Sequence, residues 1–369
     1  MRCSRQSGYS APVKNRWLII AVILSGLLVS AGCVRMQPPA PRPTPPAPAP
    51  TPRPIPPSPP RPVPPPPKPA PAPIPKPPPP PPATHVLPNA NFFAQVLLDR
   101  EHFSPGGIDG RWGRKSENAL AAWQKKHRLP ITGTLDDATR ATLGNTNGIL
   151  TTYTITAADH AALTPYPSSW LARSQQERMG FASIEEMLAE KFHLYRATLR
   201  QLNPAAPWPN PPAGVILTVP SITSRPLPEL SRIEIRLEQR SLRAYDKQDQ
   251  LVAHFPCSIA ADKAKRPVHE TLRVTVWAEN PEYTFDPELF SEDPEAAAIG
   301  KRLRIPPGPN NPVGVAWIGL DRPGYGIHGS PAPEDISNTE SHGCFRLTNW
   351  DARKLVHAVR NGLPVVVLP

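Results

Sequence analysis

The sequence predicts a protein of several domains: a mainly-β C-terminal domain, a small domain of three helices, and an α+β module between them, all preceded by a disordered proline-rich linker. The chain has 369 residues, enough for two or three domains. Proline accounts for 57 of them, about three times its ordinary usage. Of these prolines, 29 lie within the 45 residues 38–82. Beyond this tract, apolar residues first follow a helical period and later alternate as in strands.

Charge is distributed as unevenly as proline. The 41 Lys and Arg residues exceed the 30 Asp and Glu residues, for a net charge of +11. Residues 1–82 hold ten of the basic residues and none of the acidic ones, so the remaining 287 residues carry a net charge of +1. A domain that binds nucleic acid needs its positive charge on the folded surface. We therefore expect no nucleic-acid partner.

Residues 1–33 have the composition of an export signal. A basic start precedes an apolar run at 17–31, which is shorter than the about 20 residues of a membrane-spanning helix. The run ends in Ser30-Ala31-Gly32-Cys33, which resembles a bacterial lipoprotein signal. This resemblance implies lipidation of Cys33, and with Val34 next it implies an anchor in the outer membrane facing the periplasm. The alternatives are ordinary cleavage near Ala31 and an uncleaved anchor; all three export the chain.

Residues 34–88 form a linker that we expect to be disordered and extended. Proline has no backbone N–H and a restricted φ, so the tract suits neither helix nor sheet. At about 3.1 Å per residue, 45 residues of polyproline reach about 140 Å. Behind a membrane anchor, such a spacer lets the folded domains act far from the membrane.

Residues 89–145 carry the helical pattern. The first helix is expected from an apolar stripe formed by Phe92, Phe93, Val96 and Leu97. Further helices are expected over 116–127 and 136–143, the last one capped by Asp136 or Thr134. The run GIDGRWGRKSENALAAWQKKHRLPITGTLDDATRATL resembles the small three-helix peptidoglycan-binding domain. This resemblance implies a surface that binds the cell wall.

Residues 150–222 combine strands and helices. A short strand is expected at 153–155, helices at 183–190 and 192–202, and a closing strand at 214–220. With the segments LRQLNP and PPAGVILTVP, this order is similar to a LysM glycan-binding module. Residues 161–182 depart from that pattern as an insertion. The resemblance leaves two roles open, glycan binding and a spacer.

Residues 230–369 alternate between apolar and polar side chains. Strands are expected at 233–237, 271–277, 313–318 and 363–368, and a helix at 349–360. The C-terminal domain is thus predicted to be mostly β, with a helix near its end.

Cys344 is the best candidate nucleophile in the chain. A thiol needs a base or a cationic environment to become a reactive thiolate. Both His328 and His342 lie within 16 residues of it, and on a strand His342 would share its face. Gly343 allows close backbone approach, which suits an oxyanion hole built from N–H groups.

These residues carry a resemblance. The segments IHG and SHGCFRLTNWDA resemble the L,D-transpeptidase catalytic domain, whose signature is an upstream histidine followed by Ser/Thr-His-Gly-Cys. It implies that Cys344 is the acylated nucleophile and His328 the general base and later acid. The remaining implied site residues are Gly329, whose carbonyl orients His328; Ser341 of the signature; His342 and Gly343, whose backbone N–H groups join that of Cys344 at the oxyanion; and Arg346, which grips a substrate carboxylate.

The resemblance also implies a reaction on peptidoglycan stem peptides. The cysteine attacks the bond between diaminopimelate and the terminal D-Ala of a tetrapeptide, and a neighbouring stem resolves the thioester in a 3→3 cross-link. Other acceptors would give a carboxypeptidase, D-amino-acid exchange, attachment of a wall lipoprotein or cross-link hydrolysis. A non-catalytic wall tether is the alternative from another class. Carbapenems are implied to acylate Cys344.

Two other roles are open to these residues. His328, His342 and Cys344 would supply three zinc ligands, but the sequence offers no cysteine placed as a fourth ligand and no second closely spaced pair. A disulfide between Cys344 and Cys257 would remove the nucleophile, and the strand-like surroundings of Cys257 predict that it is buried. We expect no metal and no cofactor.

Overall fold

The computed structural model describes residues 87–223, 225–290, 293–339 and 343–369. The expected export signal, the lipidation site Cys33 and most of the proline-rich linker lie outside these residues, as do Ser341 and His342. Within the described ranges, no helix has both the length and the apolar character needed to cross a membrane.

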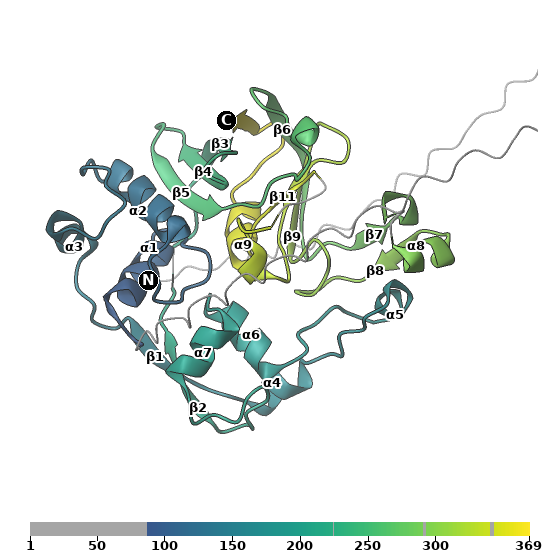
Figure 1. Cartoon of the computed structure of the whole chain (residues 1–369), viewed down its shortest axis with the longest axis horizontal. Coiled ribbons are helices and arrows are strands. Elements are labelled where there is room, and N and C mark those ends of the chain that lie inside the picture. Colours follow the sequence, from purple (N-terminus) through teal and green to yellow (C-terminus); the bar gives the residue numbers. More distant parts are fainter. Residues whose placement is uncertain (1–86, 224, 291–292, 340–342) are drawn as a thin grey trace, which may run out of the picture. The chain divides into compact units, whose positions relative to one another are not determined.

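Three helices make up the first folded domain, as predicted: α1 (Ala90–Arg100), α2 (Arg114–Lys126) and α3 (Asp137–Leu143) (Figure 1). Asp136, one of the two expected caps, accepts a hydrogen bond from the Thr139 N–H at 2.8 Å and begins α3. The second helix starts at Arg114, two residues earlier than expected.

A two-stranded antiparallel sheet frames the second module, with β1 (Leu150–Thr154) paired to β2 (Ile216–Pro220). Between them lie α4 (Ala157–Ala161), α5 (Trp170–Ser174), α6 (Ile184–Lys191) and α7 (Arg196–Leu202). The expected order of strand, two helices and strand is present, with α4 and α5 added; the likeness to LysM stays a prediction.

The helix expected over 192–202 is wrong in its first turn. His193 has a φ of 54°, in the left-handed region that interrupts a right-handed helix. The chain therefore leaves α6 after Lys191 and begins α7 only at Arg196.

An eight-stranded sheet forms the third domain, which confirms the mainly-β expectation. Its strand order is β11-β10-β9-β6-β12-β3-β4-β5. The bounds are β3 (Leu230–Arg236), β4 (Ser241–Asp246), β5 (Leu251–Pro256), β6 (Thr271–Glu279), β9 (Ala316–Leu320), β10 (Gly326–His328), β11 (Phe345–Arg346) and β12 (Pro364–Leu368). Short 3₁₀ helices follow β5 and β10: η1 (Lys263–Lys265) and η3 (Pro333–Asp335).

Helix α9 (Asn349–Val356) packs against this sheet (Figure 1). Its buried Leu355 and Val356 join the core that contains Ile318, Ile327 and Phe345 of the strands. Two expectations need correction. The helix ends at Val356 and not at residue 360, and β9 begins at Ala316 because Gly314, with a φ of 62°, turns the chain just before it.

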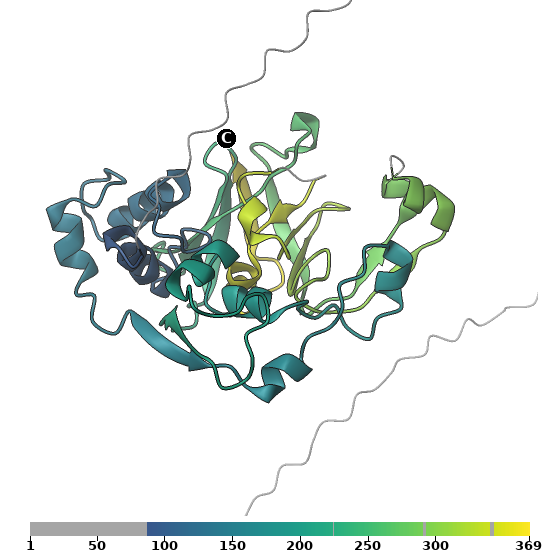
Figure 2. The ribbon, with the colours of Figure 1, turned by 60° about the horizontal axis from the view of Figure 1, so that its bottom comes forward.

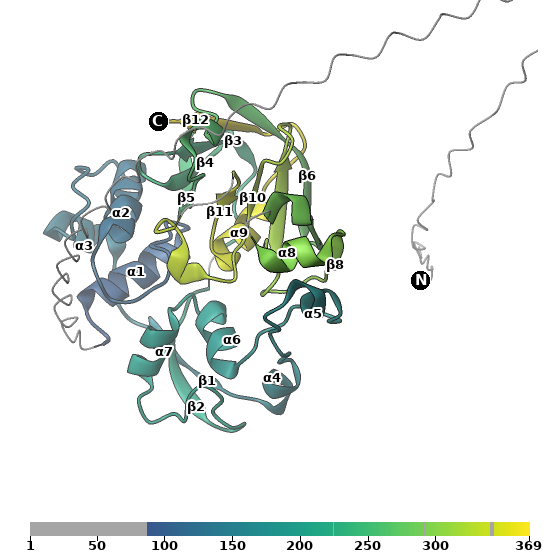
Figure 3. The ribbon, with the colours of Figure 1, turned by 45° about the vertical axis from the view of Figure 1, so that its right-hand side comes forward.

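Residues 280–309 leave the sheet between β6 and β9, and we call them the β7–β8 arm. The arm contains β7 (Tyr283–Phe285), η2 (Pro287–Phe290), α8 (Pro294–Ile299) and β8 (Leu303–Ile305). β7 and β8 form a small antiparallel sheet of their own. In Figures 2 and 3 the arm projects from the large sheet, with α5 of the second module beside it.

Candidate active site

Two short parallel strands bring the predicted catalytic residues together. β10 pairs with β11 so that Ile327 lies opposite Phe345 and His328 opposite Arg346. Ile327 and Phe345 are buried in the core. Because side chains alternate along a strand, His328 and Arg346 lie on the other face. The pairing therefore places the histidine, the arginine and the end of the cysteine-bearing loop side by side.

His328 is buried and oriented by its own neighbour. It is 6% exposed, and its Nδ1 lies 2.6 Å from the Gly329 carbonyl oxygen, the contact implied by the family resemblance. A carbonyl only accepts, so Nδ1 carries the proton and Nε2 of the neutral ring presents a lone pair. Burial lowers the pKa of His328 to about 4, despite the opposing hydrogen bond to Gly329. At neutral pH the ring is therefore a free base.

Trp317 of β9 supports the His328 ring, and the sequence analysis did not single it out. The two rings stack at 5.7 Å between centroids and 25° between planes. A Cβ on Gly326 would lie 2.6 Å from the Trp317 ring, so only glycine leaves room for it there. The sequence does show a tryptophan on the strand expected at 313–318 and Gly319 directly after it, and this is the only local pattern that could have drawn attention to Trp317.

Cys344 lies in a bend directly before β11, which corrects the expectation that it shares a strand with His342. Its Sγ is partly exposed and lies 3.4 Å from the Gly324 carbonyl oxygen. Burial raises the pKa of the Cys344 thiol, while a backbone hydrogen bond with Gly326 and the charge of Arg346 lower it in part. The resting site therefore holds a neutral thiol beside a neutral imidazole.

Arg346 joins the site to the rest of the domain. Its backbone exchanges hydrogen bonds with Ser258, at 3.0 and 2.9 Å. Burial lowers its pKa, which the negative charge of Asp335 partly restores. The charge of Arg346 in turn lowers the pKa of the Cys344 thiol.

Cys257 is fully buried and is not joined to the partly exposed Cys344. Burial raises the pKa of the Cys257 thiol far above its usual value, which makes it unreactive. The expectation of a buried, packed Cys257 is confirmed.

Tyr283 and Asn349 also border the site, and neither was predicted to have a role there. Burial raises the pKa of Tyr283 to about 12. The arm that carries Tyr283 leaves the sheet after β6, whose Ala278 lies opposite Trp317, the residue that pairs with His328. Asn349 is fully buried; its Oδ1 accepts from the Val315 N–H at 3.2 Å, and its Nδ2 donates to the Pro309 carbonyl at 3.0 Å. Asn349 thereby holds the loop before β9 against the start of α9.

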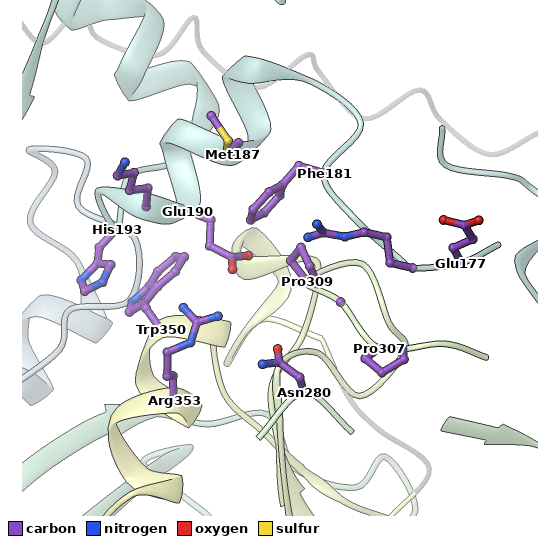
Figure 4. A pocket seen from close by; sticks show the side chains of 13 residues that line it. Glu177, Phe181, Met187, Glu190, His193, Asn280, Pro307, Pro309, Trp350 and Arg353 are labelled. Atoms are coloured by element: carbon purple, nitrogen blue, oxygen red, sulfur yellow. The ribbon is translucent and has the colours of Figure 1, made fainter. Parts of the chain in front are cut away.

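A cavity of about 610 Å³ lies elsewhere, between α6, the base of the β7–β8 arm and α9. Its lining includes neither Cys344 nor His328. In Figure 4 the Glu190 carboxylate projects into it between Trp350 and Pro309. Burial raises the pKa of Glu190 to about 7, and Glu190 accepts a 2.8 Å hydrogen bond from Asn349. The candidate nucleophile and the candidate base therefore lie outside this cavity.

Metal ligation finds no support in the described part of the chain. Among those residues, no group of three or more His, Cys, Asp and Glu side chains is arranged to hold a metal ion. His342, the third ligand of the alternative zinc site, lies outside them.

Family models match two parts of the chain. Residues 231–367 match the L,D-transpeptidase catalytic domain. The C-terminal domain is an L,D-transpeptidase catalytic domain. Residues 93–143 match a putative peptidoglycan-binding domain, which confirms the expectation for the first module. The LysM-like character of residues 150–222 remains a prediction.

Similar proteins carry the same description. The chain is 28% identical over 184 residues to the putative L,D-transpeptidase YkuD of Bacillus licheniformis, covering 50% of this chain and 93% of that protein. It is 28% identical over 182 residues to the probable L,D-transpeptidase YbiS of Escherichia coli, covering 49% of this chain and 58% of that one. A solved L,D-transpeptidase from Mycobacterium smegmatis is 17% identical with a TM-score of 0.29, covering 42% of this chain and 64% of that one.

Proposed function

We propose that this protein is a peptidoglycan L,D-transpeptidase that forms 3→3 cross-links through an acyl-enzyme on Cys344. The observation that carries the proposal is a partly exposed thiol just before β11, next to the strand β10 that carries a buried neutral histidine whose Nδ1–H is held by Gly329. A covalent cysteine enzyme needs this combination of nucleophile, base and orienting group.

Acylation begins from the neutral pair. His328 Nε2 takes the thiol proton as Cys344 Sγ attacks the carbonyl between diaminopimelate and the terminal D-Ala. The new C–S bond gives a tetrahedral oxyanion. As the C–N bond breaks, protonated His328 returns its proton to the leaving amine, and D-Ala departs. The product is a thioester, and the histidine is again a base.

The second half-reaction reverses these roles. The side-chain amine of diaminopimelate on a neighbouring stem attacks the thioester, and His328 accepts a proton from that amine. The C–S bond then breaks, the sulfur recovers the proton, and an amide joins the two stems. Such two-step chemistry predicts ping-pong kinetics.

Two kinds of group are proposed to stabilise negative charge in the reaction: backbone N–H groups at the oxyanion, and Arg346 at a substrate carboxylate. The backbone N–H groups of Gly343 and Cys344, with that of His342, are proposed to bind the oxyanion. Arg346, opposite His328 in the strand pairing, is proposed to bind a stem carboxylate.

The rest of the chain supports an action at the wall. The peptidoglycan-binding domain at 93–143 would hold the enzyme on its substrate. Periplasmic location, lipidation at Cys33 and glycan binding by the second module remain predictions from the sequence.

Purified protein incubated with disaccharide-tetrapeptides tests the proposal. We expect 3→3 dimers and released D-Ala by mass spectrometry, both abolished by Cys344→Ala. Cys257→Ala is the matched control, because that second thiol is buried and unreactive, and it should keep its activity.

The products also distinguish the other acceptors. Tripeptide with free D-Ala but no dimer would indicate hydrolysis, and incorporation of an added D-amino acid would indicate exchange. A folded protein that binds sacculi but neither releases D-Ala nor becomes acylated would contradict the proposal in favour of a non-catalytic tether.

A further inference from the structure

The β7–β8 arm cannot bury its apolar side chains by itself. Its strands have three residues each, and a lone two-stranded sheet of this size is marginal in water. Nevertheless Phe285 and Ile305 are fully buried. The cluster that buries them includes Met179 from the second module, which is 1% exposed.

Residues 164–182 of the second module, which we call the strap, complete this cluster. Trp170 stacks on Phe285 at 4.3 Å between centroids and 18° between planes, and contacts Phe290 at 5.7 Å. Its backbone N–H donates to Glu295 Oε1 at 2.6 Å, and its indole N–H donates to Asp293 Oδ2 at 3.2 Å. One side chain thus contacts both the sheet and the helix of the arm.

The strap also holds the base of the arm. The Met179 N–H donates to the Pro307 carbonyl at 2.8 Å, and its carbonyl accepts from the Asn310 N–H at 3.0 Å. A Cβ on Gly308 would lie 2.1 Å from the Met179 oxygen, so the two backbones approach as closely as glycine permits.

The strap is itself a closed loop anchored in the second module. Its ends meet where the Thr164 N–H donates to the Phe181 carbonyl at 2.9 Å. Arg173 lies over the Trp170 ring at 4.9 Å and donates to the Pro167 carbonyl at 2.9 Å. The indole is therefore presented to the arm in one fixed orientation.

The arm begins beside the candidate base, because Ala278 near the end of β6 lies opposite Trp317 of β9, and Trp317 lies opposite His328 and stacks on its ring. Tyr283 of the arm contacts Trp170 at 6.4 Å between ring centroids. We propose that the strap fixes the β7–β8 arm where it limits access to Cys344, and that Trp170 is the positioning residue through which the second module sets how a donor stem peptide is bound. The role in donor binding rests on the proposed function; the control of access to Cys344 does not.

The test compares full-length Trp170→Ala with Trp170→Phe, which keeps an aromatic ring on Phe285, and with Leu171→Ala. Leu171 is the next residue of α5 and is 46% exposed, so its truncation is a matched control. Alkylation of Cys344 by a small iodoacetamide and a bulky maleimide is followed by peptide mass spectrometry, beside KM and kcat for tetrapeptide.

We expect Trp170→Ala to speed alkylation by the bulky reagent about tenfold, with a smaller change for the small one, because the arm no longer restricts access. KM for the tetrapeptide should rise about tenfold while kcat changes less. For Trp170→Phe we expect an alkylation rate and a KM between those of the wild type and Trp170→Ala. For Leu171→Ala we expect both to equal the wild-type values. If the folded Trp170→Ala variant reacts with the bulky reagent at the wild-type rate and has the wild-type KM, the proposal is overturned.

Alkylation needs no transpeptidation, so a changed alkylation rate in a chain without transferase activity would support the strap and refute the proposed function. If Trp170→Ala does not fold, Glu295→Ala removes a contact from the side of the arm. It should raise the bulky alkylation rate in the same direction, and an unchanged rate would overturn the proposal.

Discussion

His328 and Cys344 are both held in their neutral forms by burial. Burial lowers the pKa of His328 to about 4 and raises that of the thiol, so neither group is charged in the resting enzyme at pH 7. In the proposed mechanism the proton moves when the substrate is attacked, and the Gly329 carbonyl keeps the ring in the tautomer that can accept it. The charge of Arg346 acts on both groups in the same direction, because it lowers both pKa values.

The rate of Cys344 acylation by a carbapenem should follow the ionisation of His328. The base is neutral above its pKa, so we expect a rate that is maintained down to about pH 5 and falls below it with a midpoint near 4. His328→Gln should lower the acylation rate by about 10²–10⁴-fold and remove its fall at low pH.

Arg346→Gln should move the same midpoint upward, since the positive charge that disfavours imidazolium is lost. Circular dichroism at each pH separates titration from unfolding. If the acylation rate of the wild type falls with a midpoint near pH 6.5, the prediction of a buried, neutral base is contradicted.

Among the elements, the junction of β10 with the start of α9 positions the catalytic histidine. Asn349, the first residue of α9, is 2.8 Å from Glu190 and 3.2 Å from the Val315 N–H. A Cβ on Gly329 would lie 2.4 Å from its Oδ1. Gly329 thus packs closely against Asn349 at the start of α9, and the direction of the Gly329 carbonyl depends on this contact.

Gly329→Ala should therefore disturb catalysis without removing any functional group. The added methyl must displace Asn349 or the Gly329 carbonyl, at a cost of about 1–3 kcal/mol of stability. We expect kcat/KM to fall by about 10²-fold because His328 loses its orientation. Gly113→Ala is the control, since its Cβ would meet nothing within 4 Å. Equal kcat/KM values for both variants would show that the carbonyl is not needed.

Across the described part of the molecule, one buried charge cluster links the three folded domains. Asp99 of α1 is fully buried, accepts from Lys354 of α9 at 2.9 Å and lies 2.8 Å from His193 Nδ1. Burial alone would raise the pKa of Asp99, but its interactions with His193 and Lys354 hold it well below its usual value. Burial lowers the pKa of His193, so at neutral pH a neutral ring donates to the carboxylate.

Lys354→Met should destabilise the protein, because it leaves the buried Asp99 carboxylate without its cation. We expect a loss of about 3–5 kcal/mol in the free energy of unfolding, measured by urea denaturation at pH 7. Lys247→Met is the control: that lysine is 56% exposed and pairs with the exposed Glu229, so its loss should be below about 1 kcal/mol. Equal losses in the two variants would show that the cluster does not stabilise the chain.

The parts that could be predicted from the sequence are those encoded over a few residues. Asp136 caps α3 because a cap bonds three residues ahead, and the alternation of β3 and β6 is visible in their own side chains. The errors arose where a distant or backbone feature overrode a local pattern. His193 with its positive φ interrupts the expected helix, and the turn before β11 removes Cys344 from a strand.

The sequence by itself determined the types of the first and third domains and indicated the candidate cysteine and histidine, because these depend on short patterns of residues. Only the tertiary structure decided which way His328 faces, how deeply it is buried and what flanks Cys344. Glu190 and Asn349 are 159 positions apart, Trp170 and Glu295 are 125 apart, and Ser104 and Asp351 are 247 apart. Contacts at such separations follow from strand pairing and packing between domains, and no local spacing records them.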